Sequence, residues 1–277
     1  EDPNLIHELQ QIVSSKKIDI ILPSHDEVLY ILSNSPLANI LTGSPKDTIE
    51  ICRFKSKTYK KLTTNPDLKN RVPHYKIISS GFLKPDKGQG SRGVMKVETP
   101  YLNCEFLPGK EYTVDCFTDL NGSLIYTNPR LRQTILNGIS EVTNNVNNPE
   151  FTDIAEKINK TIKFCGSWFF QMKEDSDGYL KFMEIAPRIG GGSNINRLNG
   201  VNLTLSDLYL KTGHNVKLIP QNLTQQVIRQ SPRYNLDFDT IFVDYDDTFG
   251  YIKDVLYKLN KEIIIITRSK VKVNTSY

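Results

Sequence analysis

A lysine just ahead of a glycine-rich loop is the first feature with chemical meaning. The segment 84–94 reads KPDKGQGSRGV, with Lys84 followed by Gly88, Gly90 and Gly93. Glycines let backbone amides turn inward and approach a polyphosphate closely, and a lysine adds a fixed positive charge for the same phosphates. The G-K-[ST] ending of a P-loop is missing. The segment therefore predicts a phosphate-binding loop of another type, with a flexible hairpin tip as the alternative.

Two later strands bring oxygen-bearing side chains together. The segments 166–175 and 179–186 are joined by a tight turn, so they should pair antiparallel and place Gln171 within a residue or two of Glu184. A carboxylate and an amide oxygen that converge at the end of a sheet suit Mg²⁺, which prefers oxygen ligands. Arg188 and a triple-glycine run follow. A buried polar pair bonded to backbone is the alternative.

Acidic residues also mark the segment 104–115, CEFLPGKEYTVD. Glu105 ends one strand, and a Pro-Gly turn leads into the next. Glu111 and Asp115 lie four residues apart on that second strand, and therefore on one of its faces. These carboxylates are candidates for binding, with an ordinary hairpin that has a solvated acidic edge as the alternative.

The elements that position these residues begin with an α/β pattern. Residues 4–15 and 26–34 have helical spacing, and the apolar run 18–23 between them suits a buried parallel strand. The segment 47–62 is again helical. This order is typical of half an open α/β sheet, whose glycine-rich first strand-turn-helix is not seen.

The middle of the chain changes to short strands rich in β-branched and aromatic residues. They run from about residue 75 to 129, and Asn121-Gly122 is a strong hairpin signal between two of them. The segment 143–149 is expected to be a polar loop. Helices are expected at 150–164 and 203–212.

Length and composition are those of an ordinary globular chain. The 277 residues carry 35 Lys and Arg against 31 Asp and Glu, for a formal net charge of +4. This balance is too even to predict a protein of nucleic acids or membrane surfaces, and no apolar run approaches the ~18 residues of a membrane span. Residue 1 is Glu with no basic-then-apolar leader after it, so no secretory signal is predicted.

The cysteines and histidines indicate neither disulfides nor zinc. No C-x-x-C pair occurs, so in a chain of this length the thiols are expected to be reduced filler in a cytoplasmic protein. The four histidines lack the spacing of metal ligands. The cysteines are Cys52, Cys104, Cys116 and Cys165.

Together these motifs resemble the ATP-grasp superfamily, specifically its carbamoyl-phosphate-synthase-like branch. The resemblance spans roughly residues 18–215 and rests on KPDKGQGSRGV, EFLPGKEYTVD and FFQMKEDSDGYLKFMEIAPR, with ICRFKSKTY at 51–59 as the family's first nucleotide-lysine segment. It implies a mixed α/β and α+β fold. Residues 1–46 would be part of a Rossmann-like pre-ATP-grasp domain, and 47–232 would be an ATP-grasp domain of two α+β subdomains.

The resemblance also implies a role for each matched residue. Lys55 and Lys84 would contact the ATP phosphates, and the glycine-rich loop would close over them. The adenine would lie at a hinge, Glu111 would bond the ribose, and Arg188 would be catalytic by stabilising an acyl phosphate or the transferred phosphoryl group. Gln171 and Glu184 would hold Mg²⁺. The loop residues are Gly88, Gly90, Ser91 and Gly93, and the hinge residues are Glu105, Phe106 and Leu107.

One departure from the family pattern affects the metal site. Two residues after the metal-binding glutamate the family usually has Asn, a second ligand, but here Ala186 stands at that position. Asn194 or Asn196 is a candidate replacement. Otherwise a second Mg²⁺ would be held less well.

The C-terminal segment 233–277 resembles the start of a Rossmannoid haloacid-dehalogenase-type (HAD-like) phosphatase. TIFVDYDDTFG places Asp244, Asp246 and Thr248 in D-x-D-x-T order at the end of an apolar strand. In that family the first Asp attacks phosphorus and the second acts as general acid and base. No downstream acidic pair completes a magnesium site in this sequence, so the domain would be partial. An acidic loop at a strand end is the alternative.

The resemblance as a whole implies an ATP- and Mg-dependent ligase that activates a carboxylate as an acyl phosphate for attack by an amine or a thiol. Its partners would be ATP, a small carboxylate and an amine substrate, without nucleic acid or membrane, and the oligomeric state is left open. Two alternatives stand beside it. One is a HAD-type phosphohydrolase that uses Asp244 and Asp246. The other is a non-catalytic ATP-binding module, which Ala186 favours modestly.

Overall fold

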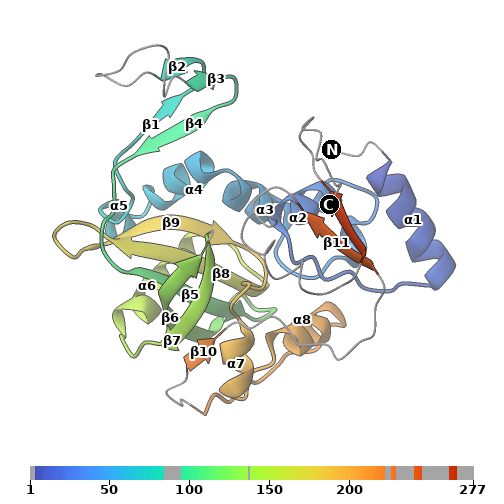
Figure 1. Cartoon of the computed structure of the whole chain (residues 1–277). Coiled ribbons are helices and arrows are strands. Elements are labelled where there is room, and N and C mark those ends of the chain that lie inside the picture. Colours follow the sequence, from blue (N-terminus) through green and yellow to red (C-terminus); the bar gives the residue numbers. More distant parts are fainter. Residues whose placement is uncertain are drawn as a thin grey trace. The chain divides into compact units, whose positions relative to one another are not determined.

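The computed structural model describes residues 4–83, 95–136, 138–221, 226–228, 240–244 and 262–266 (Figure 1). The chain divides into two compact units, Glu1–Arg229 and Gln230–Tyr277. The first unit contains three groups of elements: leading helices, a set of short strands, and a large antiparallel sheet. The division into domains at residues 46 and 232 stays a prediction.

The leading helices agree with the expected pattern, but the strand between the first two does not form. Residues 18–23 contribute only a single parallel bridge, between Ile21 and Leu41. A strand needs neighbours along its whole length to satisfy its backbone, and the described residues supply only this bridge. The helices are α1 Leu5–Lys16, α2 Asp26–Ser33, α3 Lys46–Arg53, α4 Lys55–Leu62 and α5 Pro66–Lys69, with a short 3₁₀ turn at Ala38–Ile40.

The single helix expected at 47–62 is in fact two, α3 and α4, separated at Phe54. Phe54 is extended, with φ −108° and ψ 107°. Its ring lies edge-on to Tyr30, with ring centroids 5.8 Å apart. Lys57 places its ammonium group 4.7 Å from the centroid of the same ring. The break therefore gives Phe54 packing partners and begins α4 at Lys55.

Short strands follow as expected. Strand β1 (Tyr75–Ile78) pairs antiparallel with β4 (Tyr101–Cys104), and β2 (Gly81–Leu83) pairs with β3 (Met95–Val97). Figure 1 shows β1 and β4 extending from the region of α4 and α5, with β2 and β3 at the far end.

The large sheet has six strands in the order β10-β7-β6-β5-β8-β9, and every neighbouring pair is antiparallel. The predicted hairpin joins β5 and β6, and Gly122 at its tip has φ +80°, which favours glycine. Strand β7 includes residues 143–145, so the expected polar loop at 143–149 begins three residues later than predicted. The strands are β5 Glu111–Thr118, β6 Leu124–Leu136, β7 Ile139–Asn145, β8 Gly166–Glu174, β9 Leu180–Ala186 and β10 Gln226–Ile228.

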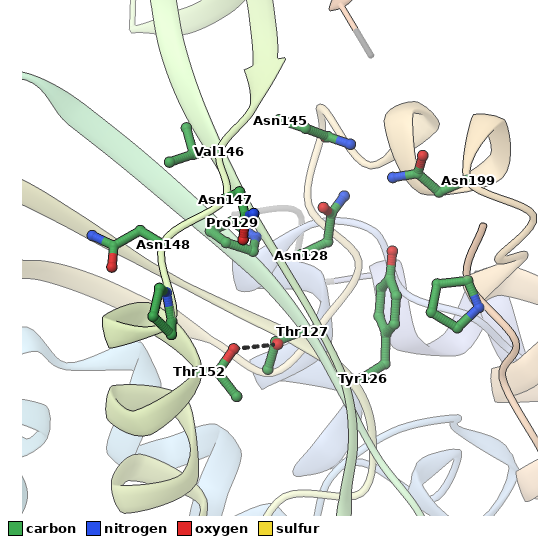
Figure 2. Close-up of a pocket in the computed structure, with 12 residues that line it drawn as sticks. Tyr126, Thr127, Asn128, Pro129, Asn145, Val146, Asn147, Asn148, Thr152 and Asn199 are labelled. Atoms are coloured by element: carbon green, nitrogen blue, oxygen red, sulfur yellow. Dashed lines mark hydrogen bonds between the residues drawn. The ribbon is translucent and has the colours of Figure 1, made fainter. Parts of the chain in front are cut away.

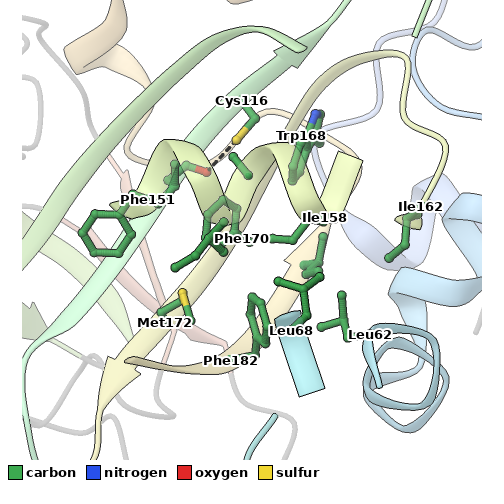
Figure 3. Packing of buried hydrophobic residues seen from close by; sticks show 14 of the residues in the cluster. Leu62, Leu68, Cys116, Phe151, Ile158, Ile162, Trp168, Phe170, Met172 and Phe182 are labelled. Atoms are coloured by element: carbon green, nitrogen blue, oxygen red, sulfur yellow. Dashed lines mark hydrogen bonds between the residues drawn. The ribbon is translucent and has the colours of Figure 1, made fainter. Parts of the chain in front are cut away.

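One face of this sheet forms the main hydrophobic core. Successive side chains on a strand alternate between faces, so Val114 on β5 and Phe170 and Met172 on β8 point to the same side and are fully buried. Helix α6 (Glu150–Thr161) covers this face with Phe151, Ile154, Ala155 and Ile158 (Figure 3). The same cluster includes Leu62 of α4 and Leu68 of α5. The opposite face carries polar side chains such as Thr113 and Asp115 together with Phe117 and Phe169.

Two helices follow the sheet in sequence. They are α7 (Asn194–Leu198) and α8 (Leu203–Lys211), the second close to the predicted 203–212. Val201, Leu203 and Leu210 pack with Phe117 and Tyr126 in a separate small cluster.

The second unit contains two described strands, β11 (Thr240–Asp244) and β12 (Glu262–Ile266), which pair in parallel. Strand β11 is the apolar strand expected just before Asp244.

The thiols of all four cysteines are free. Cys52 and Cys116 are buried and Cys165 is half-buried, but Cys104 is exposed and is not the filler expected. Among the described residues, no helix is long and apolar enough to cross a membrane.

Candidate active site

A row of polar residues crosses four strands on the face of the sheet opposite α6. Thr113 of β5 lies directly opposite Arg130 of β6 and Gln171 of β8, and Gln171 lies opposite Glu184 of β9. Directly opposed residues of an antiparallel pair point to the same face. The predicted neighbourhood of Gln171 and Glu184 is therefore confirmed.

This row forms one wall of a pocket of about 260 Å³. The triple-glycine run that follows Arg188 lies along the same pocket. The lining residues are Thr113, Arg130, Arg132, Gly138, Ile139, Ser140, Phe169, Gln171, Glu184, Arg188, Gly190, Gly191 and Gly192.

Lys55 lies beside the metal-ligand candidates. Its Nζ is 3.4 Å from Oε2 of Glu184, and both side chains keep substantial exposure, 54% and 36%. Helix α4 is fixed to β9 next to this pair, because the Tyr59 hydroxyl donates to the carbonyl oxygen of Met183 at 2.9 Å. Burial raises the pKa of Tyr59, and the nearby Cys104 and Glu184 raise it further, so the phenol remains a proton donor. A lysine and a carboxylate thus meet at the place predicted for nucleotide phosphates and a metal.

The amide of Gln171 is oriented by its neighbour. Its Nε2 donates to Oγ1 of Thr113 at 3.3 Å, which leaves the amide oxygen as the ligand atom. Together with the half-exposed Glu184 carboxylate, this donor set of hard oxygens fits Mg²⁺. Within the described ranges, no three His, Cys, Asp or Glu side chains come together as a possible metal site. The metal would therefore take its remaining ligands from water and phosphate, as Mg²⁺ usually does.

Asn196 does not replace the ligand lost at Ala186. It is fully buried, and its amide bonds inside the protein. Its Oδ1 accepts from the Tyr126 hydroxyl and from Asn128, and its Nδ2 donates to Asp115. Both polar atoms of the Asn196 amide are therefore already hydrogen-bonded, and its oxygen is not available to a metal.

A buried ion pair holds one cation at the pocket wall. Nε of Arg130 donates to Oδ2 of Asp115 at 2.8 Å, and the two side chains are 3% and 2% exposed. The guanidinium group passes so close to the glycine run that a Cβ at Gly192 would lie 2.6 Å from Nη1 of Arg130. A Cβ at Gly190 would lie 3.0 Å from Oδ1 of Asp115. A side chain at Gly192 would therefore force the ion pair to shift, and one at Gly190 would crowd it.

Glu111, the predicted ribose ligand, is also buried among cations. Its carboxylate accepts a hydrogen bond from Arg132 and lies 3.8 Å from Nζ of Lys173. Arg132 lines the pocket. Glu111 therefore lies next to the site, and its role toward ribose stays a prediction.

Arg188, the predicted catalytic cation, is clamped by a residue from the leading helices. Its guanidinium binds both carboxylate oxygens of Asp26, with Nε donating to Oδ1 at 2.7 Å. It also lies over the ring of Phe169, 5.1 Å from the centroid. Asp26 begins α2, so the leading segment positions a side chain of the pocket.

The predicted adenine hinge directly follows Cys104 in the chain. Burial and Glu105 raise the pKa of the Cys104 thiol, whereas the Lys55 ammonium lowers it. Lys55 therefore lies near the start of the hinge. Oε1 of Glu105 is buried without a hydrogen-bond partner. The next side chain, Phe106, is 86% exposed, and Leu107 is half-buried. An unpartnered acceptor beside an exposed aromatic ring suits a flat, amine-bearing ring system such as adenine.

Several predicted residues lie outside the described residues, namely Lys84, Gly88, Gly90, Ser91, Gly93 and Asp246. Asp244 ends strand β11. Their roles stay predictions.

The structure adds four residues to the site that the sequence motifs did not single out, namely Asp26, Thr113, Arg130 and Arg132. The two arginines follow the hairpin at a spacing of two, which is the signal for one face of a strand. That spacing could have placed both arginines on the face of Asp115 and Glu111.

Comparisons with known proteins bear on the fold. The segment 98–232 matches the model of a family described as ATP-grasp in the biosynthetic pathway with Ter operon. A search of curated proteins gave no match.

Solved structures that resemble this chain include two biotin carboxylases and a pyruvate carboxylase. The biotin carboxylase domain of Hydrogenobacter thermophilus 2-oxoglutarate carboxylase, in complex with MgADP, ADP and bicarbonate, has 13% identity and a TM-score of 0.58, over 79% of this chain and 59% of that one. Campylobacter jejuni biotin carboxylase, in a β-γ-ATP complex, has 15% identity and a TM-score of 0.58, over 79% and 60%. Rhizobium etli pyruvate carboxylase with acetyl coenzyme-A has 14% identity and a TM-score of 0.57, over 75% and 21%.

The fold is that of ATP-grasp proteins. The segment 98–232 matches the ATP-grasp family model, and the structural matches show the same fold. The chain spans less than two thirds of the length of each of these three solved proteins.

Proposed function

We propose that this chain is an ATP- and Mg²⁺-dependent ligase of the carbamoyl-phosphate-synthase-like type, which converts a carboxylate to an acyl phosphate and then joins it to an amine or a thiol. The observation that carries the proposal is the convergence of Lys55, Gln171 and Glu184 at a pocket that also contains Arg130 and Arg188. The carbamoyl-phosphate-synthase-like assignment itself rests on the sequence motifs.

The nucleotide would bind between the hinge and the sheet. Glu105 offers a buried acceptor to an adenine amino group, and Phe106 offers an exposed ring for stacking. Lys55, and by its motif Lys84, would neutralise phosphate charge. Gln171 and Glu184 would hold Mg²⁺, which when bound would supply positive charge against the charge that develops on the phosphates.

The chemistry then needs alignment and charge neutralisation more than proton transfer. A carboxylate oxygen attacks the γ-phosphorus, an O–P bond forms, and the bond to the β-phosphate oxygen breaks to release ADP. The amine or thiolate next attacks the carbonyl carbon, and phosphate leaves with the bonding electron pair. An amine also loses one proton, to the departing phosphate or to water. Arg130 and Arg188 would stabilise the carboxylate and the acyl phosphate. Two observations support this role: both residues line the pocket, and each guanidinium is bound by a carboxylate.

The HAD-like activity at Asp244 and Asp246 remains a separate proposal, because no described contact involves these side chains. A colorimetric phosphatase assay with Asp244→Asn as control tests it independently of the ligase.

The ligase proposal is tested by ATP turnover. The full chain is incubated with Mg-ATP and a panel of small carboxylates and amines, and carboxylate-dependent release of ADP is measured. Glu184→Gln is expected to lower turnover at least about 100-fold, as expected when a charge-stabilising group is lost from a phosphoryl-transfer site. Lys60→Met serves as the matched control for Lys55→Met, because Lys60 is an exposed lysine of the same helix. Tight nucleotide binding with no ADP release in any combination would contradict a ligase and favour the binding module.

A further inference from the structure

A second pocket lies apart from the candidate active site and shares no lining residue with it. We call it the asparagine pocket. It has a volume of about 450 Å³ and is shown in Figure 2. Its lining residues are Tyr126, Thr127, Asn128, Pro129, Asn145, Val146, Asn147, Asn148, Pro149, Thr152, Asn199 and Pro220.

The pocket lies beside the part of β6 that β7 does not cover. The pairing of β7 with β6 begins at Arg130, and one further hydrogen bond joins the Val146 amide to the Pro129 carbonyl at 2.9 Å. In the described ranges, the segment 124–129 of β6 pairs only with β5. The chain after Val146 turns into α6, and the hydroxyls of Thr127 and Thr152 close one side of the pocket with a 2.9 Å hydrogen bond.

The lining is polar but carries no charge. Among the twelve lining residues are five asparagines, two threonines and a tyrosine, and none is Asp, Glu, Lys, Arg or His. A phosphate or carboxylate ligand would normally be met by Arg or Lys. Side chains of this kind suit a neutral molecule that both donates and accepts hydrogen bonds.

One lining side chain has a hydrogen-bonding atom without a partner. Asn199 is 4% exposed, and its Oδ1 is buried with no hydrogen bond in the protein. The backbone of Asn199 is held firmly, because its carbonyl accepts from the Gln221 amide at 2.9 Å. A buried acceptor of this kind normally has a partner. A ligand N–H or O–H would supply one when the Asn199 amide turns its oxygen toward the pocket.

The asparagine pocket is also connected to the candidate active site. The Tyr126 hydroxyl and Nδ2 of Asn128 both donate to Oδ1 of Asn196, at 2.9 and 2.6 Å. Nδ2 of Asn196 donates to Oδ2 of Asp115 at 3.1 Å, and the same oxygen accepts from Arg130. A ligand that contacts Tyr126 or Asn128 therefore touches the network that holds Arg130 in place.

We propose that the asparagine pocket is a second ligand site, for a neutral small molecule that carries several hydroxyl or amide groups. Such a molecule would donate to Oδ1 of Asn199 and would bond to the amides around it. Sugars and peptide-like amides share this chemistry, and the probes below distinguish them.

The test is binding measured without nucleotide, so that it does not depend on the ligase. Saturation-transfer NMR on the full chain compares three neutral probes: methyl α-glucoside for hydroxyls, N-acetylglycinamide for amides, and N-acetylglucosamine for both. Glucose 6-phosphate is the charged comparison. We expect at least one neutral probe to bind with Kd on the order of millimolar, as for small fragments in a polar site, and the phosphate to bind at least about tenfold more weakly.

Two tryptophan variants locate the binding. Asn147 is an exposed lining residue, so Asn147→Trp fills the pocket without touching the core, and Asn121→Trp places the same side chain on an exposed hairpin tip. Asn147→Trp should weaken probe binding at least about tenfold, and Asn121→Trp should leave it unchanged. Asn199→Leu, if it folds, should have the effect of Asn147→Trp. The proposal is overturned if no neutral probe binds, if glucose 6-phosphate binds as well as they do, or if the folded Asn147→Trp variant binds like the wild type.

Discussion

The substitution Gly192→Ala examines how tightly the glycine run and the buried ion pair fit together. The backbone of Gly192 is not in the left-handed region, so alanine can adopt it. Without a clash, the change would stabilise the chain by about 0.4–1 kcal/mol, because it restricts the unfolded state. In the structure, however, the new Cβ would lie 2.6 Å from Nη1 and 3.0 Å from Cζ of Arg130. The contact therefore decides the sign of the effect.

The guanidinium group of Arg130 cannot move away freely. Its Nε is bound to Asp115 at 2.8 Å, and both side chains are almost fully buried. Overpacking of this kind typically costs about 1–3 kcal/mol. For a chain of this size, such a loss lowers Tm by roughly 2–12 °C, at about 2–4 °C per kcal/mol. Gly192→Ala should therefore destabilise the protein.

A double-mutant cycle with Arg130→Ala identifies the cause, with stability measured by urea unfolding. Removing the Arg130 side chain removes the clash, so Gly192→Ala should cost little in that background. We expect a coupling free energy of about 1–3 kcal/mol between the two sites, within the range seen for residues in contact. Coupling below about 0.5 kcal/mol would refute the reasoning, because it would mean that Gly192 and Arg130 do not compete for space.

Three further predictions concern carboxylates. Burial raises the pKa of Asp207 to about 6 from an ordinary 3.8. Between these two pH values the folded state binds more protons than the unfolded state, so the free energy of unfolding should fall as pH rises through this window. Measured by urea unfolding, Asp207→Asn should therefore be more stable than the wild type by up to about 3 kcal/mol at pH 8, and equally stable at pH 3. Asp26→Asn should loosen Arg188 and lower turnover roughly tenfold with little change in ATP affinity, and an equal loss in affinity would contradict a role in positioning Arg188. Glu111→Gln should weaken ATP binding roughly tenfold if Glu111 bonds the ribose, and unchanged affinity in calorimetry would exclude that role.

The sequence predicted much of the sheet because its signals are local. Asn121-Gly122 specified the hairpin, and the turn before Tyr179 specified the pairing that joins Gln171 to Glu184. Most of the other strands and helices were predicted from alternation and helical spacing, but the order of the six strands was not. These predictions needed only neighbours along the chain.

What the sequence could not predict depends on contacts between distant segments. The clamp on Arg188 comes from Asp26, which lies 162 positions away in the sequence. Strand formation at 18–23 failed because the described residues give it only the bridge at Ile21, and the break at Phe54 reflects packing against Tyr30. The unpartnered oxygen of Asn199 is likewise visible only once the fold has enclosed it.

The central claim is that Lys55 and Glu184 belong to one magnesium–nucleotide site. Calorimetric titration of ATP with and without Mg²⁺ tests it most directly, on the wild type and on Lys55→Met, Glu184→Gln and the control Lys60→Met. We predict Mg²⁺-dependent binding to the wild type and to Lys60→Met. Binding to Lys55→Met should be about 10- to 100-fold weaker, the effect of one lost charge-assisted contact, and Mg²⁺ should no longer strengthen binding to Glu184→Gln. Equal affinity and equal Mg²⁺ dependence in all four proteins would contradict the claim.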